Sequence, residues 1–132
     1  MDEQSEKTFH AEVTAGQTGM NHKNVLRLLG AGRSSIIKNG SSQGDAFYIV
    51  SELANNGEAF DYVEAAGGLT EPKARQMFSQ LCSAVEYIHK KGVAHRDLKL
   101  ENCFLDSKAQ LKLADSGLMK VFAGPNGKTL MT

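Results

Sequence analysis

Between His95 and Asn102 the chain carries a carboxylate, a lysine and an amide within six residues, and a second carboxylate, Asp115, follows thirteen residues later. Asp97 can accept the proton of an attacking hydroxyl, a general-base role worth roughly 10²–10⁴ in rate. Asn102 and Asp115 offer hard oxygen ligands, which Mg²⁺ prefers, with phosphate oxygens and water as the remaining ligands. Lys99 can place a cation beside a transferring phosphate. These residue types in this order predict phosphoryl transfer.

The segment from His95 to Asn102 fits the catalytic-loop pattern H-R-D-L-x-x-x-N at every specified position. On these residues the chain resembles part of a eukaryotic protein kinase domain. The resemblance implies Mg-ATP as the phosphoryl donor and a protein serine or threonine hydroxyl as the acceptor, because a lysine at position 99 is typical of serine/threonine kinases. It also implies three catalytic residues, Asp97, Lys99 and Asn102, and two metal ligands, Asn102 and Asp115.

Two neighbours of Asp97 have supporting roles in that family. The resemblance makes His95 a buried packing residue beneath the metal-binding turn. It makes Arg96 the partner of a phosphorylated activation-segment residue, through a bidentate, charge-assisted contact. Thr129 and Thr132 are both candidates for phosphorylation, and the sequence does not rank them.

The stretch from Ser51 to Glu58 is similar to the kinase hinge, the crossing between the small and large lobes. An adenine edge presents one donor beside one acceptor, so two main-chain groups can bind it. By resemblance these groups are the carbonyl of Glu52 and the amide of Ala54, while Glu58 would reach the ribose hydroxyls and Ser51 would be a small gatekeeper. The alternative is an ordinary strand followed by a helix, with Glu58 favoured there by the helix dipole.

The second motif departs from the family, because Asp115-Ser116-Gly117 stands where kinases usually have D-F-G. Ser116 removes an aromatic ring that in the family packs against His95 and a glutamate-bearing helix. Truncating a buried aromatic side chain generally costs about 3–5 kcal/mol, so a looser active arrangement is expected. The departure leaves a second function open, a pseudokinase-like nucleotide- or protein-binding regulatory module without catalysis.

The clearest helix is predicted to begin after Thr70, a good N-cap, and to end before Gly92, with Pro72 tolerated in the first turn. Apolar residues at spacings of three and four predict one broad stripe that belongs to the core: Ala74, Met77, Phe78, Leu81, Val85 and Ile88. A weaker helix is expected within the first twenty-one residues. By resemblance, Glu12 or else Glu6 would be the helix glutamate that pairs with a strand lysine.

Shorter elements are predicted around these helices. The runs 25–29 and 47–50 fit two strands joined by a turn-rich loop at 38–44, and 111–114 alternates as a strand. A short helix is expected to end at Gly67-Gly68.

Two glycine motifs are not interpreted as nucleotide-binding loops. Gly30-Ala31-Gly32 has Ser35 where a third glycine is needed. The stretch 122–129 ends in G-K-T like a Walker loop but begins with Phe122 instead of glycine.

These elements and the resemblance predict an α+β chain, a fragment of the bilobal protein-kinase fold. Residues 1–54 would form the remainder of the small lobe and the hinge, and 55–132 the first part of the large lobe through the start of the activation segment. The sequence contains no glycine-rich phosphate loop, no lysine strand ahead of the helix glutamate and no A-P-E segment. The fragment is therefore expected to be inactive alone. The stretches 48–52 and 57–62 look most similar to calcium/calmodulin-dependent-type kinases.

The composition limits the classes of partner and the cellular location that are expected. The formal net charge is zero with 23% charged residues, so neither a nucleic-acid nor a membrane surface is indicated. No apolar run approaches the ~18 residues of a membrane span and the first residues resemble no signal peptide, so a cytoplasmic or nuclear chain is expected. Cys82 and Cys103 are expected to be reduced structural thiols, and the lone His22 and His89 to be structural or exposed. The oligomeric state stays open.

Overall fold

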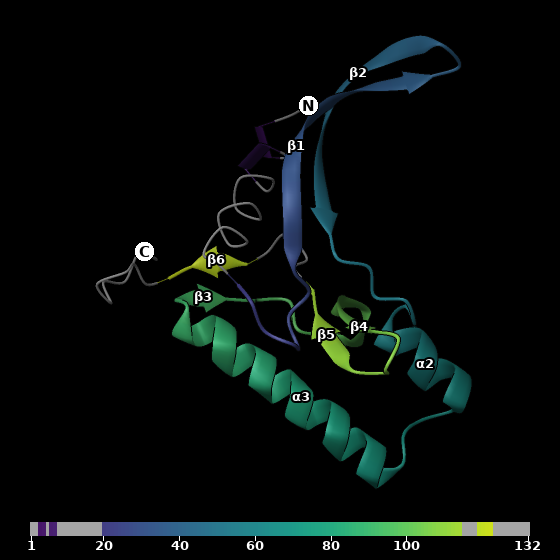
Figure 1. Ribbon diagram of the computed structural model, residues 1–132, viewed down its shortest axis with the longest axis vertical. Coiled ribbons are helices and arrows are strands. Elements are labelled where there is room, and N and C mark those ends of the chain that lie inside the picture. The colour runs from purple at the N-terminus through teal and green to yellow at the C-terminus, as the bar shows by residue number, and fades with distance from the viewer. Residues whose placement is uncertain (1–2, 5, 8–19, 115–118, 123–132) are drawn as a thin grey trace.

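The computed structural model describes residues 3–4, 6–7, 20–114 and 119–122. A long hairpin of β1 and β2 rises from a lower body in which α3 lies beneath the short strands and α2 lies beside them (Figure 1). In chain order the elements are β1 (Leu28–Lys38), β2 (Ser41–Ser51), α2 (Ala59–Ala66), α3 (Glu71–Lys90), β3 (Val93–Ala94), the 3-10 turn η1 (Leu100–Asn102), β4 (Cys103–Leu105), β5 (Leu111–Leu113) and β6 (Lys120–Val121). The expected α+β class is confirmed. Residues 3, 4, 6 and 7 are helical and include Glu6, whereas Glu12 lies outside the described residues.

The hairpin is longer than the sequence predicted. Instead of a short strand at 25–29 and a loop at 38–44, two 11-residue strands are joined by the two-residue turn Asn39-Gly40. Both turn residues have positive φ, 53° and 79°, as type I′ turns require. The loop prediction was wrong because two residues suffice for the turn, and the polar residues around it pair across the hairpin, as Ser35 does with Asp45.

Gly30-Ala31-Gly32 lies inside β1. A Cβ on Gly32 would lie 2.5 Å from the hydroxyl oxygen of Tyr48, its partner across the hairpin. A larger residue at this position would therefore need the exposed Tyr48 ring to move. The glycines of this motif have a structural role in a strand, in keeping with the rejection of a nucleotide loop.

Both predicted helices after the hairpin are confirmed, with their ends. α2 ends at Gly67, which has the left-handed φ of 70° that glycine adopts without strain. α3 begins after Thr70, whose Oγ1 accepts the Lys73 N–H at 3.4 Å, and it has Pro72 in its first turn. The chain turns after α3 at Gly92, with φ 76°. In the part of the chain that the structure describes, no helix has the length and apolar character of a membrane span.

The core lies between α3 and the short strands. β5 pairs with β4 in an antiparallel ribbon, and Val25 adds a parallel bridge to Leu113 on β5. The inner side of α3 packs against β3 and β5. Buried core side chains from these elements are Met77, Ala84, Ile88, Val93, Cys103, Leu105, Leu111 and Leu113. Full burial of one such large aliphatic side chain contributes about 1.5–3 kcal/mol, so this cluster fixes the strands on which the site is built.

Only one side of the α3 stripe belongs to this core. Met77 and Ile88 are buried, whereas the Phe78 side chain is 66% exposed. The prediction that the whole stripe is core was wrong for Phe78, because the described residues cover only the inner side of the helix. The two thiols divide in the same way, since both are free but Cys103 is buried and Cys82 is exposed.

Candidate active site

His95 organises the loop that follows β3. Its side chain is 2% exposed. Its Nδ1 accepts the backbone N–H of Asp97 at 3.1 Å, so the proton belongs on Nε2, which lies 2.7 Å from the carbonyl oxygen of Ala114. One neutral tautomer satisfies both bonds, and it joins the loop to the end of β5. The expected structural role of His95 therefore takes the form of two hydrogen bonds in addition to packing.

Asp97 and Asn102 are in direct contact. The Asn102 amide nitrogen Nδ2 donates to the Asp97 carbonyl oxygen at 2.9 Å and to its carboxylate Oδ2 at 3.0 Å. Lys99 Nζ lies 3.7 Å from the same Oδ2, on a side chain that is half exposed. The five-residue spacing thus closes into a compact loop, in which Lys99 precedes the 3-10 turn η1 and Asn102 is its last residue. The three residues predicted to be catalytic lie together.

Ala114, the residue before Asp115, is bonded on both sides. Its N–H donates to the Asn102 carbonyl oxygen at 2.8 Å, and its own carbonyl oxygen accepts from His95 Nε2. These bonds bring the end of β5 beside the catalytic loop. Asp115 and Ser116 lie outside the described residues, as do Thr129 and Thr132.

Arg96 has a backbone conformation that a non-glycine residue rarely adopts, with φ 69°. Such a conformation costs of order 1–3 kcal/mol and persists only where neighbouring contacts enforce it. Here the hydrogen bond between the Asp97 N–H and His95 Nδ1 joins the two residues on either side of Arg96. The strained residue therefore lies directly before Asp97, within the turn that this bond closes.

Glu52, at the end of β2, has a bonding pattern that the sequence did not reveal. Its carboxylate Oε1 accepts the Arg27 backbone N–H at 2.9 Å and the Lys112 Nζ at 3.1 Å, and its own N–H donates to the Arg27 carbonyl oxygen at 2.9 Å. Lys112 lies on β5, and its side chain is only 13% exposed. The Glu52 side chain thus ties the hairpin to the strand that leads to Ala114. No local motif signals this pair, which is separated by sixty residues.

The segment after Glu52 pairs with β4. The Asn56 N–H donates to the Leu105 carbonyl oxygen, and the Leu105 N–H donates to the Gly57 carbonyl oxygen, both at 2.9 Å. Glu58 forms a bridge with Phe104 and occupies the N-cap of α2 without a side-chain capping bond. The position at a helix start agrees with the dipole alternative for Glu58 and is equally compatible with the ribose role.

β4 thus links the two halves of the candidate site. Asn102 immediately precedes this strand, and Glu58 lies opposite its middle residue. The Ala54 carbonyl oxygen accepts the Gly57 N–H at 3.2 Å, so it belongs to the turn that enters this pairing. Glu52 is connected to the same ribbon through Lys112 on β5.

The donor set can be tested for Mg²⁺. Asn102 directs its amide nitrogen at Asp97, and the reverse orientation would place an oxygen against two oxygens, so Oδ1 is the atom presented to a ligand. A neutral amide oxygen, with carboxylate oxygens nearby, fits a hard cation. Among the described residues no cluster of three or more His, Cys, Asp or Glu side chains could hold a metal ion. The fit therefore depends on Asn102 together with Asp115.

Three features of the site define a class of protein: the buried histidine, the amide–carboxylate pair, and the strand that connects them to the end of β2. The family model of the protein kinase domain matches residues 1–132, and the chain belongs to that family. The expected family and its fold class are thereby confirmed. Members of this family generally use Mg-ATP.

The similar curated proteins are serine/threonine-protein kinases. The chain is 46% identical over 98 residues to SIK1 of Mus musculus, 44% over 98 residues to SIK1 of Rattus norvegicus and 52% over 73 residues to SIK2 of Gallus gallus. These alignments cover 74%, 74% and 55% of this chain and 11%, 12% and 9% of the relatives. The chain thus spans about a tenth of the length of these relatives. The serine/threonine type agrees with their names, and the calcium/calmodulin-dependent likeness stays a prediction.

Proposed function

We propose that the chain carries the phosphoryl-transfer centre of a protein serine/threonine kinase that uses Mg-ATP. The observation that carries this proposal is the Asp97–Asn102 pair, in which one amide nitrogen lies 3.0 Å from the carboxylate and 2.9 Å from the carbonyl oxygen of the same residue. This double contact orients the carboxylate before any substrate arrives. Orientation of this kind supplies much of the catalytic effect in phosphoryl transfer, where the protein mainly positions reactants and neutralises charge.

In the proposed reaction Asp97 accepts the proton of a substrate serine or threonine hydroxyl. The hydroxyl oxygen forms a bond to the terminal phosphorus of ATP, and the bond from that phosphorus to the bridging oxygen breaks, which releases ADP. Lys99, 3.7 Å from the Asp97 carboxylate, neutralises charge on the transferring group. Asn102 Oδ1 and Asp115 would hold Mg²⁺, which when bound neutralises phosphate charge.

The adenosine end of the nucleotide is assigned to the segment after β2. The Glu52 carbonyl and the Ala54 amide would bind adenine, Glu58 the ribose, and Ser51 would border the pocket as gatekeeper. The bond from Lys112 to the Glu52 carboxylate supports this assignment, because it fixes the segment relative to β5. Residues 1–54 would then belong to the small lobe and hinge, and 55–132 to the large lobe.

The 132 residues by themselves are expected to have little or no kinase activity, because their sequence lacks the glycine-rich loop and the strand lysine of the family. Transfer of labelled phosphate from ATP to a serine peptide measures this. Robust labelling that depends on Asp97 would contradict the expectation. The alternative function, a pseudokinase-like binding module, is favoured by one observation, Ser116 in place of the usual phenylalanine.

A hybrid enzyme tests the proposed function directly. Residues 93–118 of this chain replace the aligned residues of the mouse relative, and phosphate transfer to a serine peptide is measured. We expect the hybrid to be active and Asp97→Asn to lower kcat by roughly 10²–10⁴. Asp106→Asn is the matched control, because this carboxylate lies in the same segment but accepts, among the described residues, the backbone N–H groups of Lys108 and Gln110 in the β4–β5 turn.

The outcomes separate the two functions. An active hybrid that needs Asp97 but not Asp106 supports the kinase. A hybrid that is inactive until Ser116→Phe is introduced supports the pseudokinase-like module. A hybrid that is inactive with either residue at position 116, although it folds, overturns the assignment of catalysis to this segment.

A further inference from the structure

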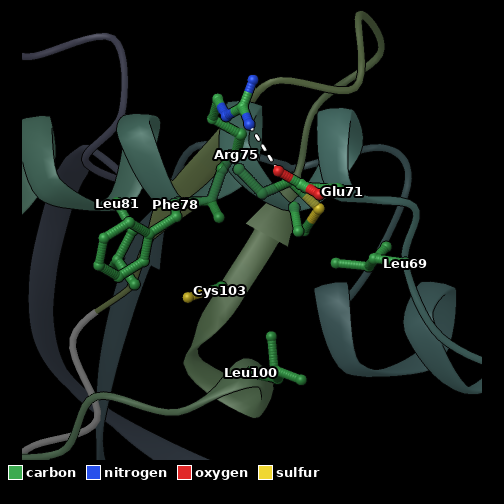
Figure 2. Close-up of a pocket in the computed structure, with 10 residues that line it drawn as sticks. Leu69, Glu71, Arg75, Phe78, Leu81, Leu100 and Cys103 are labelled. Carbon is green, nitrogen blue, oxygen red and sulfur yellow. Dashed lines mark hydrogen bonds and ion pairs between the residues drawn. The ribbon is translucent and has the colours of Figure 1, made fainter.

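The dipeptide asparagine–glycine occurs twice among the described residues. Asn39-Gly40 is the turn between β1 and β2, at the end of the hairpin farthest from the lower body (Figure 1), and Asn56-Gly57 lies between β2 and α2. All four residues are exposed. A third copy, Asn126-Gly127, lies outside the described residues. Neither described dipeptide lines the apolar pocket beside α3 (Figure 2), so occupation of that pocket leaves a comparison of the two sites unchanged.

Asparagine followed by glycine can react within its own backbone. The glycine nitrogen attacks the asparagine carbon Cγ, a bond forms between these two atoms, and the bond from Cγ to Nδ2 breaks. The backbone proton leaves with the side-chain nitrogen as ammonia, and a cyclic succinimide remains. Water then adds to either ring carbonyl and breaks its bond to nitrogen, which gives aspartate or isoaspartate. Glycine favours ring closure because it has no Cβ and the greatest backbone freedom.

At Asn56-Gly57 hydrogen bonds hold both reacting groups. The nucleophile, the Gly57 nitrogen, donates to the Ala54 carbonyl oxygen at 3.2 Å. The leaving group, Asn56 Nδ2, donates to the Asp106 carbonyl oxygen at 2.8 Å. The Asn56 N–H donates to the Leu105 carbonyl oxygen, and the Gly57 carbonyl oxygen accepts the Leu105 N–H, both at 2.9 Å. Ring closure at this site requires bonds to break, because the nucleophile and the carboxamide are directed at different partners.

At Asn39-Gly40 the corresponding groups are not held. Within the part of the chain that the structure describes, neither the Asn39 carboxamide nor the Gly40 N–H has a hydrogen-bond partner. An ideal Cβ built on Gly40 meets no heavy atom within 4 Å, so there is space for a ring to form. The two dipeptides thus share residue types and exposure but differ in the bonds of the atoms that would react.

The end of the hairpin can also open without disturbing the core. The register shifts between Ser35 and Ile37, and from there to the turn the strands pair at Ile37–Ser42 and Lys38–Ser41. All of these residues are exposed. Exposed pairs near a turn open at low free energy, which allows the backbone rotation that ring closure needs.

We propose that Asn39 is a site of spontaneous deamidation in the folded chain and that hydrogen bonds protect Asn56 from the same reaction. Isoaspartate at position 39 adds one carbon to the main chain of a two-residue turn, and the length of a hairpin loop fixes the register of its strands. This product loosens the pairing of Lys38 with Ser41. The aspartate product retains the turn, because Asp-Gly is also favoured there, and adds a negative charge beside Lys38.

Peptide mapping by mass spectrometry, after incubation of the folded 132-residue chain at neutral pH, tests the proposal. Separate proteolytic peptides report on positions 39, 56 and 126. We expect Asn39 to deamidate at least about 10-fold faster than Asn56, because several hydrogen bonds must break first at the second site. Incubation in concentrated urea is the matched comparison, since both sites then lack structure and their rates should become similar. Asn39→Gln should abolish the fast reaction.

Amide exchange of the purified isoaspartate product tests the consequence for the hairpin. We expect faster exchange at Lys38 and Ser41 and an unchanged rate at Leu113, whose N–H donates to the Asn24 carbonyl oxygen in the core. Asn39→Asp is the matched control, because it carries the same charge on a backbone of native length and should keep the slower exchange. Unchanged exchange beside the turn in the isoaspartate product would contradict the expected loss of register.

Three results would overturn the proposed site. Equal rates at Asn39 and Asn56 in the folded chain would mean that the bonds of Asn56 give no protection. A rate ratio that persists in urea would assign the difference to the neighbouring residues and not to the structure. A much slower reaction of Asn39 in the folded chain than in urea would mean that the hairpin turn itself prevents ring closure.

Discussion

The catalytic-loop region from β3 to Ala114 and the β1–β2 hairpin are both built on strands, but they are stabilised in opposite ways. The hairpin has 11-residue strands, a two-residue turn, and mostly exposed side chains. The catalytic-loop region has strands of two or three residues, and its bonds reach far along the chain, from Leu111 to Asn24 and to Gln80. Pairing between neighbouring strands is enough to form the hairpin. The catalytic-loop region instead depends on buried hydrogen bonds between distant segments, which are costly to leave unmade.

The largest expected difference concerns packing. Ile88→Ala removes a fully buried side chain beneath the catalytic-loop region and should lower the free energy of unfolding by about 2–5 kcal/mol. Ile37→Ala, on the hairpin, should change it by no more than about 0.5 kcal/mol. Urea unfolding followed by circular dichroism measures both. Equal losses would show that the hairpin shares the core, and the contrast between the regions would be lost.

The next effect concerns the buried histidine. His95→Leu leaves the Asp97 N–H and the Ala114 carbonyl without their partner, so we expect a loss of about 1–3 kcal/mol in the free energy of unfolding. His89→Leu is the control, because His89 is exposed and its ring makes, among the described residues, an edge contact with Phe122, and its loss should stay below about 1 kcal/mol. A His95 variant as stable as its control would contradict the bonding role of this side chain.

The two cysteines extend the comparison to chemical reactivity. Burial, and to a lesser degree the neighbouring Glu101, raises the pKa of the Cys103 thiol from 9.0 to about 11. Since the thiolate is the reactive form, at pH 8 Cys103 should react with a maleimide at least about 100-fold more slowly than the exposed Cys82. The variants Cys82→Ser and Cys103→Ser separate the two rates.

The same shift predicts a dependence of stability on pH. A raised pKa means that the folded state binds the proton more tightly, so the stabilisation is complete below pH 9 and is lost as the pH rises toward about 11. Unfolding measured across this range should show the decrease in the native chain and a smaller decrease in Cys103→Ser. A native chain without an excess decrease would show that Cys103 is reached by water.

The smallest effect lies in the hairpin turn. Gly40→Ala places a Cβ at φ 79°, which costs about 1–2 kcal/mol, and because the turn is far from the core the loss should appear as faster amide exchange near the tip. Gly30→Ala is the matched control, because an added Cβ at that position has open space around it. If Gly40→Ala also lowered the global stability, the hairpin and the core would form one cooperative unit.

Much of the site could be predicted from the sequence because its parts are local. Asp97, Lys99 and Asn102 lie within six residues, so their spacing nearly determines their contact. The caps of α3 are equally local, since a threonine side chain reaches only the backbone of its own turn. The length of β1 and β2 was underestimated for a related reason, because polar residues between two apolar runs are typical of both a loop and an exposed hairpin.

The sequence by itself therefore determined that Asp97, Lys99 and Asn102 lie together and where the helices end, because both depend on residues a few positions apart. Only the tertiary structure decided that Lys112 bonds Glu52, that His95 joins Asp97 to Ala114, and which side of α3 is buried. Those contacts depend on how distant segments pack, and no local pattern contains that information. Packing determines which polar side chains are buried next to one another, and a buried polar group needs a hydrogen-bond partner.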